Sequence, residues 1–364
     1  MIQQTQYTPT TPKYNFPHTP EDLALPQQFI ELSLLSMKTT HGQSLQPNLS
    51  YTDITATSQP TTPTLPTLEK PSIQPIPLKP LQNEITPVVA IDVSSIKIGE
   101  TQTGILIAIR GAIVWKQKNQ YKYLRLGPFP FHMTEENKKE IYNLFRRYYF
   151  EAPTSDVNAP ILAHMQTRMS SLLEHWLQMD VSCSSHNSLI LWDGCLTAGT
   201  PDSPVQVVSQ LLEAARNRYN TVLAFSKTTS LRFGDRRLTD LTWEYQPPYL
   251  LEINGFSTSL GPLHLLGRMY VAKLTNGACS FRLDIDREVP REQEVEAVQK
   301  LLGNDLLLEG YPETLRLAHI FSTFTANEVI GIQRFTAQTY GLKIVERPNV
   351  RRLLFGPYGK GPEE

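Results

Sequence analysis

From Pro87 onward, short apolar runs alternate with amphipathic stretches. The run VVAIDVSS is rich in β-branched residues and predicts a buried strand that delivers Asp92 near its end. The segment GILIAIRGAIVW (104–115) predicts two further strands with a turn at Gly111, and the alternation in YKYLRL extends the second of them. The pattern therefore predicts an antiparallel meander that opens with a strand carrying an acid.

Helical and strand patterns alternate after the meander. The stretch TEENKKEIYNLFRRYYFEA and the segments 161–179 and 205–219 predict helices. Between them, SLILWDGCL is a short apolar run that ends at Asp193, and TVLAFSK is another that ends at Lys227. Strands that alternate with helices after a meander predict an α/β fold with a mixed sheet flanked by helices.

Two patterns in the last third of the chain carry ionisable residues. ACSFRLDID predicts a strand with Asp284 and Asp286 two positions apart and hence on one face. A helix is predicted to open at Tyr311, Pro312 and Glu313, because proline is favoured at a first helical position. His319 lies on a row of that helix with Leu315, Ser322 and Ala326.

The beginning of the chain has a different composition. Fourteen of the 28 prolines precede Asp92, mixed with Thr, Gln and Ser. Such a segment buries too little apolar surface to offset its ordering entropy. We therefore expect residues 1–84 to form a mostly disordered tail, with one short helix around Gln27 to Met37, and residues 85–364 to form the folded domain.

Charge and cysteine content narrow the class of protein. Lys and Arg (34) almost balance Asp and Glu (35), so affinity for nucleic acid requires a local basic patch. The three cysteines lack the paired spacings of zinc sites and disulfide scaffolds, which favours a reducing cytoplasmic compartment. Neither a membrane span nor a signal peptide is expected from the apolar runs.

Asp92 and Asp193 are the strongest candidates for chemistry. A carboxylate at the end of a buried strand is poorly solvated and is repelled by a second one nearby, so it needs a cation or a proton. Oxygen ligands suit Mg²⁺ or Mn²⁺, and two such ions stabilise both oxygens in phosphodiester cleavage. The alternative is that each aspartate caps a turn, which is common before glycine.

Five runs, taken in order, are similar to successive motifs of the NurA nuclease family: VVAIDVSS, LILWDGCL, VLAFSKTTSLR, SFRLDI and EGYPETLRLAHIF. The resemblance extends from about Val88 to the C-terminus and implies an RNase H-like fold. It also implies a Mn²⁺-dependent DNA nuclease, for which Mg²⁺ is a possible substitute, acting as a 5′ to 3′ exonuclease and single-strand endonuclease on DNA ends in double-strand break repair. The implied partners are DNA, a second copy of the chain and a HerA-type hexameric ATPase.

By position, the resemblance implies that Asp92, Glu174 and Asp193 are the catalytic metal ligands. Asp284 is a weaker fourth candidate, because Asp286 could serve equally. Periodicity alone places Glu174 on the solvated face of its helix, away from the apolar stripe.

His319 lies in the late motif, and the resemblance implies that it is a catalytic residue, either a ligand or a proton donor to the leaving group. A histidine on a helical row with Leu and Ala is otherwise most often a half-buried structural residue. For contact with substrate phosphates we consider Lys227 and the loop arginines Arg232, Arg236 and Arg237. A further basic run comprises Lys116, Lys118, Lys122 and Arg125, although charge groups of this kind are usually solvated surface.

Two other functions remain open at this stage. One is an RNase H-like nuclease that acts on RNA or branched DNA, because nothing in the motifs reads the sugar. The other is a non-catalytic nucleic-acid-binding module in which the acids are structural. Convergence of Asp92, Glu174 and Asp193 in space separates the enzyme from the module.

Overall fold

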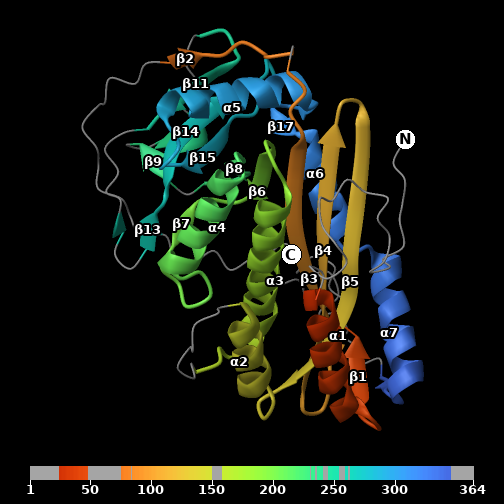
Figure 1. Ribbon diagram of the computed structural model, residues 1–364. Coiled ribbons are helices and arrows are strands. Elements are labelled where there is room, and N and C mark those ends of the chain that lie inside the picture. Colours follow the sequence, from red (N-terminus) through yellow and green to blue (C-terminus); the bar gives the residue numbers. More distant parts are fainter. Residues whose placement is uncertain are drawn as a thin grey trace.

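The computed structural model describes residues 24–47, 75–82, 84–149, 158–229, 231–233, 236–240, 245–253, 259–260 and 263–345. Its helices pack on both faces of one large sheet (Figure 1). The helices are α1 (Ala24–Met37), α2 (Lys138–Tyr149), α3 (Leu162–Ser184), α4 (Val205–Asn217), α5 (Arg291–Asn304), α6 (Glu313–Ser322) and α7 (Ala326–Tyr340).

The large sheet has eleven strands in the order β18-β1-β3-β6-β8-β15-β14-β11-β2, with β4 paired to β3 and β5 to β4. Its central strands β3, β6 and β8 are parallel, and most of the other pairings are antiparallel. The predicted mixed sheet flanked by helices is thus confirmed. The strands are β1 (Ser44–Pro47), β2 (Pro75–Pro77), β3 (Val88–Glu100), β4 (Gly104–Gln117), β5 (Gln120–Thr134), β6 (Leu189–Asp193), β8 (Thr221–Ser226), β11 (Tyr249–Glu252), β14 (Gly267–Lys273), β15 (Phe281–Asp286) and β18 (Lys343–Ile344).

Smaller pairings lie outside this sheet. They are formed by β7 (Thr197–Ala198), β9 (Arg232–Phe233), β10 (Arg236–Arg237), β12 (Ser259–Leu260), β13 (Leu263–Leu265), β16 (Leu307–Leu308) and β17 (Tyr311–Pro312). Of these, β17 matters most for the site, because it leads directly into α6.

Alternation along the central strands divides the core between the two faces of the sheet. On β3, Val89 and Ile91 pack with apolar side chains of α1, α2, α3 and α4. Val88 and Ala90 pack with α5 and α6 on the opposite face. Because side chains alternate along a strand, Asp92 follows Ala90 onto the face that α6 covers. The apolar pattern of one strand thus decides which helix meets the acid.

The predicted turn at Gly111 is wrong. Gly111 lies inside β4, and the chain reverses instead at Lys118, whose φ is 56°. A Cβ at position 111 would lie 2.6 Å from Cδ1 of Leu177 on α3. Glycine at this position therefore lets α3 pack close to the sheet. A glycine inside a strand pattern can thus mark a close helix contact and not a turn.

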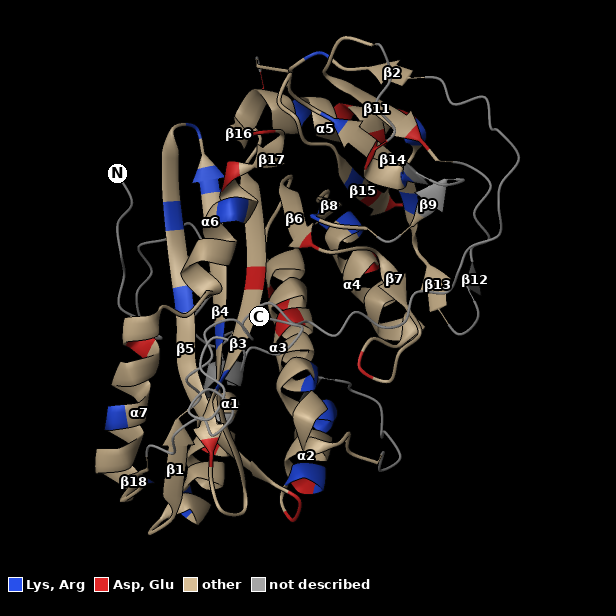
Figure 2. Cartoon of the chain, turned by 180° about the vertical axis from the view of Figure 1, so that it is seen from behind, with Lys and Arg blue, Asp and Glu red and all other residues tan. Residues whose placement is uncertain are grey.

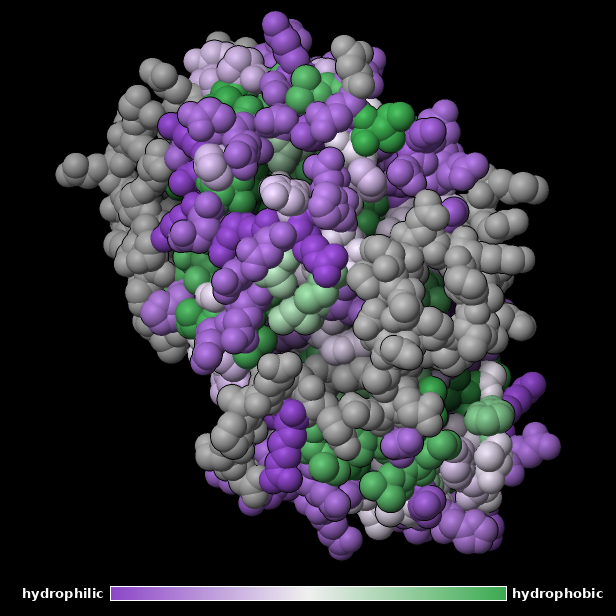
Figure 3. Space-filling view, viewed as in Figure 1, coloured by the Kyte–Doolittle hydropathy of each residue, from purple (hydrophilic) through white to green (hydrophobic). Residues whose placement is uncertain are grey.

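Part of the first 84 residues is packed into the fold. The predicted short helix is present as α1, and Phe29 is 1% exposed, with ring centroids 4.8 Å from those of Phe129 and Phe145. Strand β1 pairs with β3 and β18, and β2 pairs with β11. Figure 3 shows apolar side chains at the surface in the lower part of the molecule, where Figure 1 places α1 and β1. On α1, Leu34 and Leu35 are exposed. The described parts of the N-terminal segment therefore contribute to the core.

Helix α3 continues five residues beyond the predicted end at Met179. The predicted apolar stripe of this helix is confirmed in part: Met165, Met169 and Leu172 are fully buried and Trp176 is half-buried, whereas Ile161 precedes the helix and is 60% exposed. Within the described ranges, every helix is too short or too polar to span a membrane.

Candidate functional site

Asp92 is a buried acid that faces α6. It is 6% exposed, and its Oδ2 accepts hydrogen bonds from Ser322 Oγ and, at 3.4 Å, from Ser94 Oγ. His319 Nδ1 lies 3.4 Å from the same oxygen. Burial acts to raise the pKa of Asp92, but the contacts with His319 and Ser322 outweigh it and lower that pKa below the ordinary value. Asp92 is therefore ionised at neutral pH.

Asp193 ends the neighbouring strand. Strands β3 and β6 are parallel, with Ile91 opposite Trp192, so the next residues, Asp92 and Asp193, emerge on the same face. Gly194 follows with a φ of 122°, which few other residues adopt, and ends the strand. Lys227 Nζ donates to Asp193 Oδ2 at 2.6 Å, but burial still raises the pKa of Asp193 above its ordinary value.

His319 completes a group of possible metal ligands. One ligand atom from each of Asp92, Asp193 and His319 lies within 4.8 Å of the other two. The His319 side chain is 49% exposed, so the group opens to solvent on the α6 side. The two carboxylates are oxygen ligands of the kind that suit Mn²⁺ and Mg²⁺, and the imidazole adds a nitrogen ligand that favours a transition metal over Mg²⁺.

Glu174 approaches the two aspartates from α3. Acidic segments lie at the same height on β3 and on the helix beside it (Figure 2). Burial, followed by the charges of Asp92 and Asp193, raises the pKa of Glu174 to about 8. Periodicity alone placed this side chain in solvent, whereas the structure brings it half-buried beside the acids. Its carboxylate lies outside the 4.8 Å group of three.

Tyr311 is a site residue that the sequence reasoning missed. Its side chain is 8% exposed and its hydroxyl has no hydrogen-bond partner among the described residues. Burial, followed by the charges of Asp193 and Asp92, raises its pKa. Lys227 Nζ lies 5.8 Å from the centroid of its ring. The sequence feature that could have drawn attention to Tyr311 is its place in the motif EGYPETLRLAHIF, eight residues before His319.

Ser322 was also missed as a contact of Asp92. It lies on the same helical row as His319, one turn further along, and its hydroxyl also lies 2.8 Å from Ser94 Oγ. The row of α6 that carries His319 therefore supplies two polar contacts to one carboxylate.

Asp284 lies in a separate ion pair. It is fully buried on β15, where Arg282 Nε and Nη2 donate to its two carboxylate oxygens at 2.8 and 2.6 Å. The backbone N–H of Leu196 also donates to it at 3.0 Å. Asp286 pairs with Arg216. The structure thus assigns both acids to arginines and does not bring them into the group of possible ligands.

The candidates for phosphate contact are placed unevenly. Lys227 lies at the site, 38% exposed. Arg237 is exposed on β10, whereas the side chains of Arg232 and Arg236 lie outside the described part of the chain. Arg125 is engaged with Glu328 at 2.7 Å.

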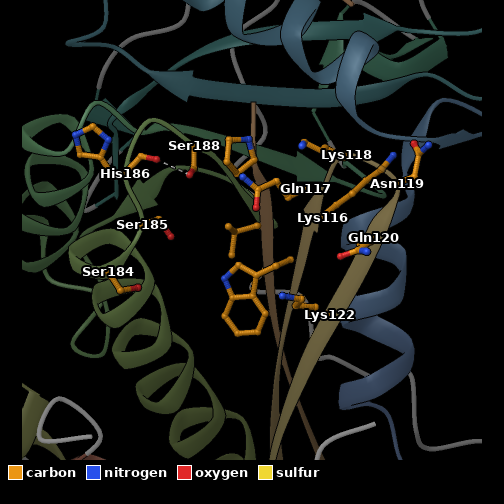
Figure 4. A pocket seen from close by; sticks show the side chains of 13 residues that line it. Lys116, Gln117, Lys118, Asn119, Gln120, Lys122, Ser184, Ser185, His186 and Ser188 are labelled. Atoms are coloured by element: carbon orange, nitrogen blue, oxygen red, sulfur yellow. Dashed lines mark hydrogen bonds between the residues drawn. The ribbon is translucent and has the colours of Figure 1, made fainter. Parts of the chain in front are cut away.

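The basic run Lys116, Lys118 and Lys122 lines a cavity of about 700 Å³ between the end of α3 and the β4–β5 hairpin. Figure 4 shows Ser184, Ser185 and His186 on one side and Lys118, Gln120 and Lys122 on the other. Lys116 also lies 3.5 Å from Asp305 Oδ1. This cavity is separate from the acids, because it lies at the opposite end of β6 from Asp193.

Comparison with known proteins gives matches to solved structures alone. No family model matches the chain, and no curated protein matches it. The NurA nuclease from Sulfolobus solfataricus is 16% identical over 72% of this chain and 86% of its own, with a TM-score of 0.45. Endonuclease V from Ciona intestinalis, solved with inosine-containing DNA, is 11% identical over 70% of this chain and 92% of its own, with a TM-score of 0.34. The family that the sequence motifs resemble is thus among the similar structures.

Proposed function

We propose that this protein is a metal-dependent nuclease that hydrolyses phosphodiester bonds in DNA. The observation that carries the proposal is the convergence of Asp92, Asp193 and His319 within 4.8 Å, with Glu174 close enough for its pKa to rise to about 8. Carboxyl groups that are close together and poorly solvated retain a proton when no cation is present. A divalent metal ion can replace that proton and balance their charges.

The residues present fit Mn²⁺ or Mg²⁺. Asp92, Asp193 and His319 would hold the ion, and Glu174 would join them on losing its proton. Such an ion, when bound, stabilises negative charge on the oxygens of the scissile phosphate and lowers the pKa of bound water.

The surrounding side chains supply the remaining functions. Lys227 is partly exposed beside Asp193, where its ammonium can bind a phosphate oxygen. The unpartnered hydroxyl of Tyr311 can donate a hydrogen bond to the same phosphate. As an alternative to binding the ion, His319 at the open side of the group could protonate the leaving oxygen.

The resemblance to NurA-type nucleases extends this proposal. We infer 5′ to 3′ exonuclease and single-strand endonuclease activity on DNA ends in double-strand break repair, by a cytoplasmic homodimer working with a HerA-type hexameric ATPase. Nuclease action on RNA or branched DNA is the second candidate, since the acids do not distinguish the sugars.

One assay tests the activity and the substrate together. The full chain is incubated with 5′- and 3′-labelled single-stranded and duplex DNA, a branched duplex and RNA of the same sequence, over a Mn²⁺ and Mg²⁺ titration. We expect metal-dependent cleavage of DNA that is lost in Asp92→Asn. Cleavage that persists in that variant, or that occurs equally in EDTA, would contradict the proposed site. Faster cleavage of RNA than of DNA would make RNA the substrate and would leave the proposed metal-dependent phosphodiester hydrolysis unchanged.

A further inference from the structure

A chain of three polar side chains leads to Glu174 from the loop that precedes α4. Ser203 Oγ lies 2.5 Å from His175 Nε2, and His175 Nδ1 lies 2.9 Å from Gln178 Oε1. Gln178 Nε2 then donates to Glu174 Oε1 at 3.4 Å. His175 and Gln178 share α3 with Glu174, and Gln178 lies three positions after His175 and four after Glu174, so the helix itself brings Gln178 beside both.

The direction of each hydrogen bond follows from the atoms involved. Nδ1 of His175 faces an amide oxygen and must carry the hydrogen, which leaves Nε2 of the neutral ring to accept from the Ser203 hydroxyl. The amide oxygen of Gln178 is then occupied, and its NH₂ group points to Glu174. The chain therefore presents a donor to one carboxylate oxygen of Glu174.

Both ends of this chain are fixed by burial. Gln178 is 4% exposed, and Asp202, which precedes Ser203, is 2% exposed. Asp202 accepts hydrogen bonds from Tyr142 and, at 2.7 Å, from Arg168, which anchors the loop to α2 and α3. The side chains also line a cavity of about 150 Å³ into which Glu174 and Asp193 both extend.

We propose that Gln178, held by His175 and Ser203, is a positioning residue that keeps the carboxylate of Glu174 turned toward Asp92 and Asp193. The inference rests on the proposed metal-dependent activity. Without a donor on its far side, a glutamate repelled by two aspartates would swing into the adjoining cavity, away from a bound ion. Partners of this kind that orient metal ligands commonly change metal affinity ten- to a hundredfold when they are removed.

The first test compares two buried glutamine-to-leucine substitutions. Mn²⁺ affinity of the full chain is measured by titration calorimetry, together with the melting temperature of the metal-free protein. Gln178→Leu is expected to weaken Mn²⁺ binding roughly tenfold or more. Gln333→Leu is the matched control. Gln333 is also buried on a helix, α7, and its side-chain amide donates to the backbone carbonyl of Ile98 at 3.0 Å. It should lower the melting temperature and leave Mn²⁺ affinity unchanged.

The second test separates positioning from packing at His175. Asparagine places its amide near the position of Nδ1 and can still donate to Gln178, whereas glutamine reaches the position of Nε2 and contacts Ser203 instead. We expect His175→Asn to keep most of the Mn²⁺ affinity and His175→Gln to lose it about tenfold. A role in packing alone predicts the reverse order, because glutamine fills the larger volume.

The outcomes of these tests distinguish the positioning role of Gln178 from the proposed metal-dependent activity. If wild type binds Mn²⁺ and Asp92→Asn does not, but Gln178→Leu binds like wild type, the positioning role is refuted and the metal site stands. Wild type that binds no Mn²⁺ in calorimetry would refute both. Equal losses of Mn²⁺ affinity in His175→Asn and His175→Gln would also contradict the proposed direction of the hydrogen bonds from Ser203 to Glu174.

Discussion

Two groups of buried and half-buried carboxylates lie on the large sheet and on the helices that cover it, and their charges are compensated differently. We call Asp92, Asp193 and Glu174 the strand-end group, after Asp193 at the end of β6, although β3 continues beyond Asp92 to Glu100 and Glu174 lies on α3. We call Asp284, Asp286 and Glu294 the arginine-paired group. In the arginine-paired group every acid has its own guanidinium, from Arg282, Arg216 and Arg268 respectively. In the strand-end group the described cationic partners are Lys227, on Asp193, and the exposed His319.

The contrast shows what identifies a candidate metal site. Asp284 is more deeply buried than Asp92, at 0% against 6% exposure, so burial does not separate the two groups. Arginine stays charged in proteins and neutralises its partner permanently. The strand-end group lacks such partners. Burial raises the pKa of Glu174 and Asp193, but it also raises that of Glu294 beside Arg268, so the missing guanidinium and not the pKa separates the two groups. Acids without a permanent cationic partner are the better candidates for binding a metal ion.

Asparagine substitutions in the strand-end group should give the largest effect on activity. Asp92→Asn and Asp193→Asn are expected to reduce cleavage by roughly a thousandfold or more, because each removes a charged ligand. The melting temperature of the metal-free protein should stay level or rise, since one charge leaves a crowded group. Rates on end-labelled DNA and thermal melts of the same samples check both statements. Normal cleavage, or outright unfolding, would contradict the assignment.

The same kind of change in the arginine-paired group should affect stability instead. Asp284→Ala leaves the buried guanidinium of Arg282 without its carboxylate, which is expected to destabilise the fold by about 3 to 5 kcal/mol. Cleavage per folded molecule should be retained. Denaturant melts and active-site titration with Mn²⁺ give the two quantities. Loss of Mn²⁺ binding in a folded Asp284→Ala protein would restore Asp284 as a metal ligand.

The sequence predicted the strand-end acids because local patterns determine them. An apolar β-branched run that ends in an acid gave Asp92 and Asp193 their strands, and parallel pairing then placed them side by side. Glu174 was not predictable from periodicity, because its surroundings depend on how α3 packs against β3. Only the resemblance to a nuclease family drew attention to it.

Long-range contacts explain the other differences from prediction. The helix around Gln27 to Met37 was predicted, but its place in the core was not, because Phe29 becomes a core residue only when rings from β5 and α2 surround it. Gly111 reads as a turn in sequence, but the reason for it is Leu177, 66 positions away on α3. Asp284 and Arg282 are two residues apart, yet the sequence does not show that they would face each other in a dry interior.

A substitution of His319 tests whether this exposed residue is part of the site formed by Asp92 and Asp193. If it protonates the leaving oxygen, His319→Ala should slow cleavage about a hundredfold with little change in Mn²⁺ affinity. If it is a ligand, affinity should fall together with rate. Single-turnover rates and calorimetry on one variant separate these cases. Unchanged turnover per folded molecule would remove His319 from the site and leave Asp92 and Asp193 as its centre.

The smallest expected effect is a pH dependence of stability, to which Glu174 contributes and the raised pKa of Glu294 adds with the same sign. The pKa of Glu174 is raised from 4.5 to about 8, so between these values the folded protein holds a proton that the unfolded chain has released. Raising the pH through this window therefore favours unfolding of the metal-free protein. Asp193 contributes with the same sign, since its pKa is also raised, whereas the lowered pKa of Asp92 stabilises the fold above 3.8.

Glu174→Gln isolates the contribution of this residue, because glutamine has no proton to lose. Melting temperatures of metal-free wild type should fall between pH 5 and pH 8 more steeply than those of Glu174→Gln. Saturating Mn²⁺ should abolish the difference in slope, because a bound ion keeps the carboxylate charged, and Mn²⁺ affinity of wild type should rise with pH up to about 8 as binding displaces the proton. Parallel melting curves for the two metal-free proteins would show that Glu174 is ionised without an ion. The strand-end group would then hold the charge of Glu174 without a metal ion, which would contradict the expected need for a cation at this site.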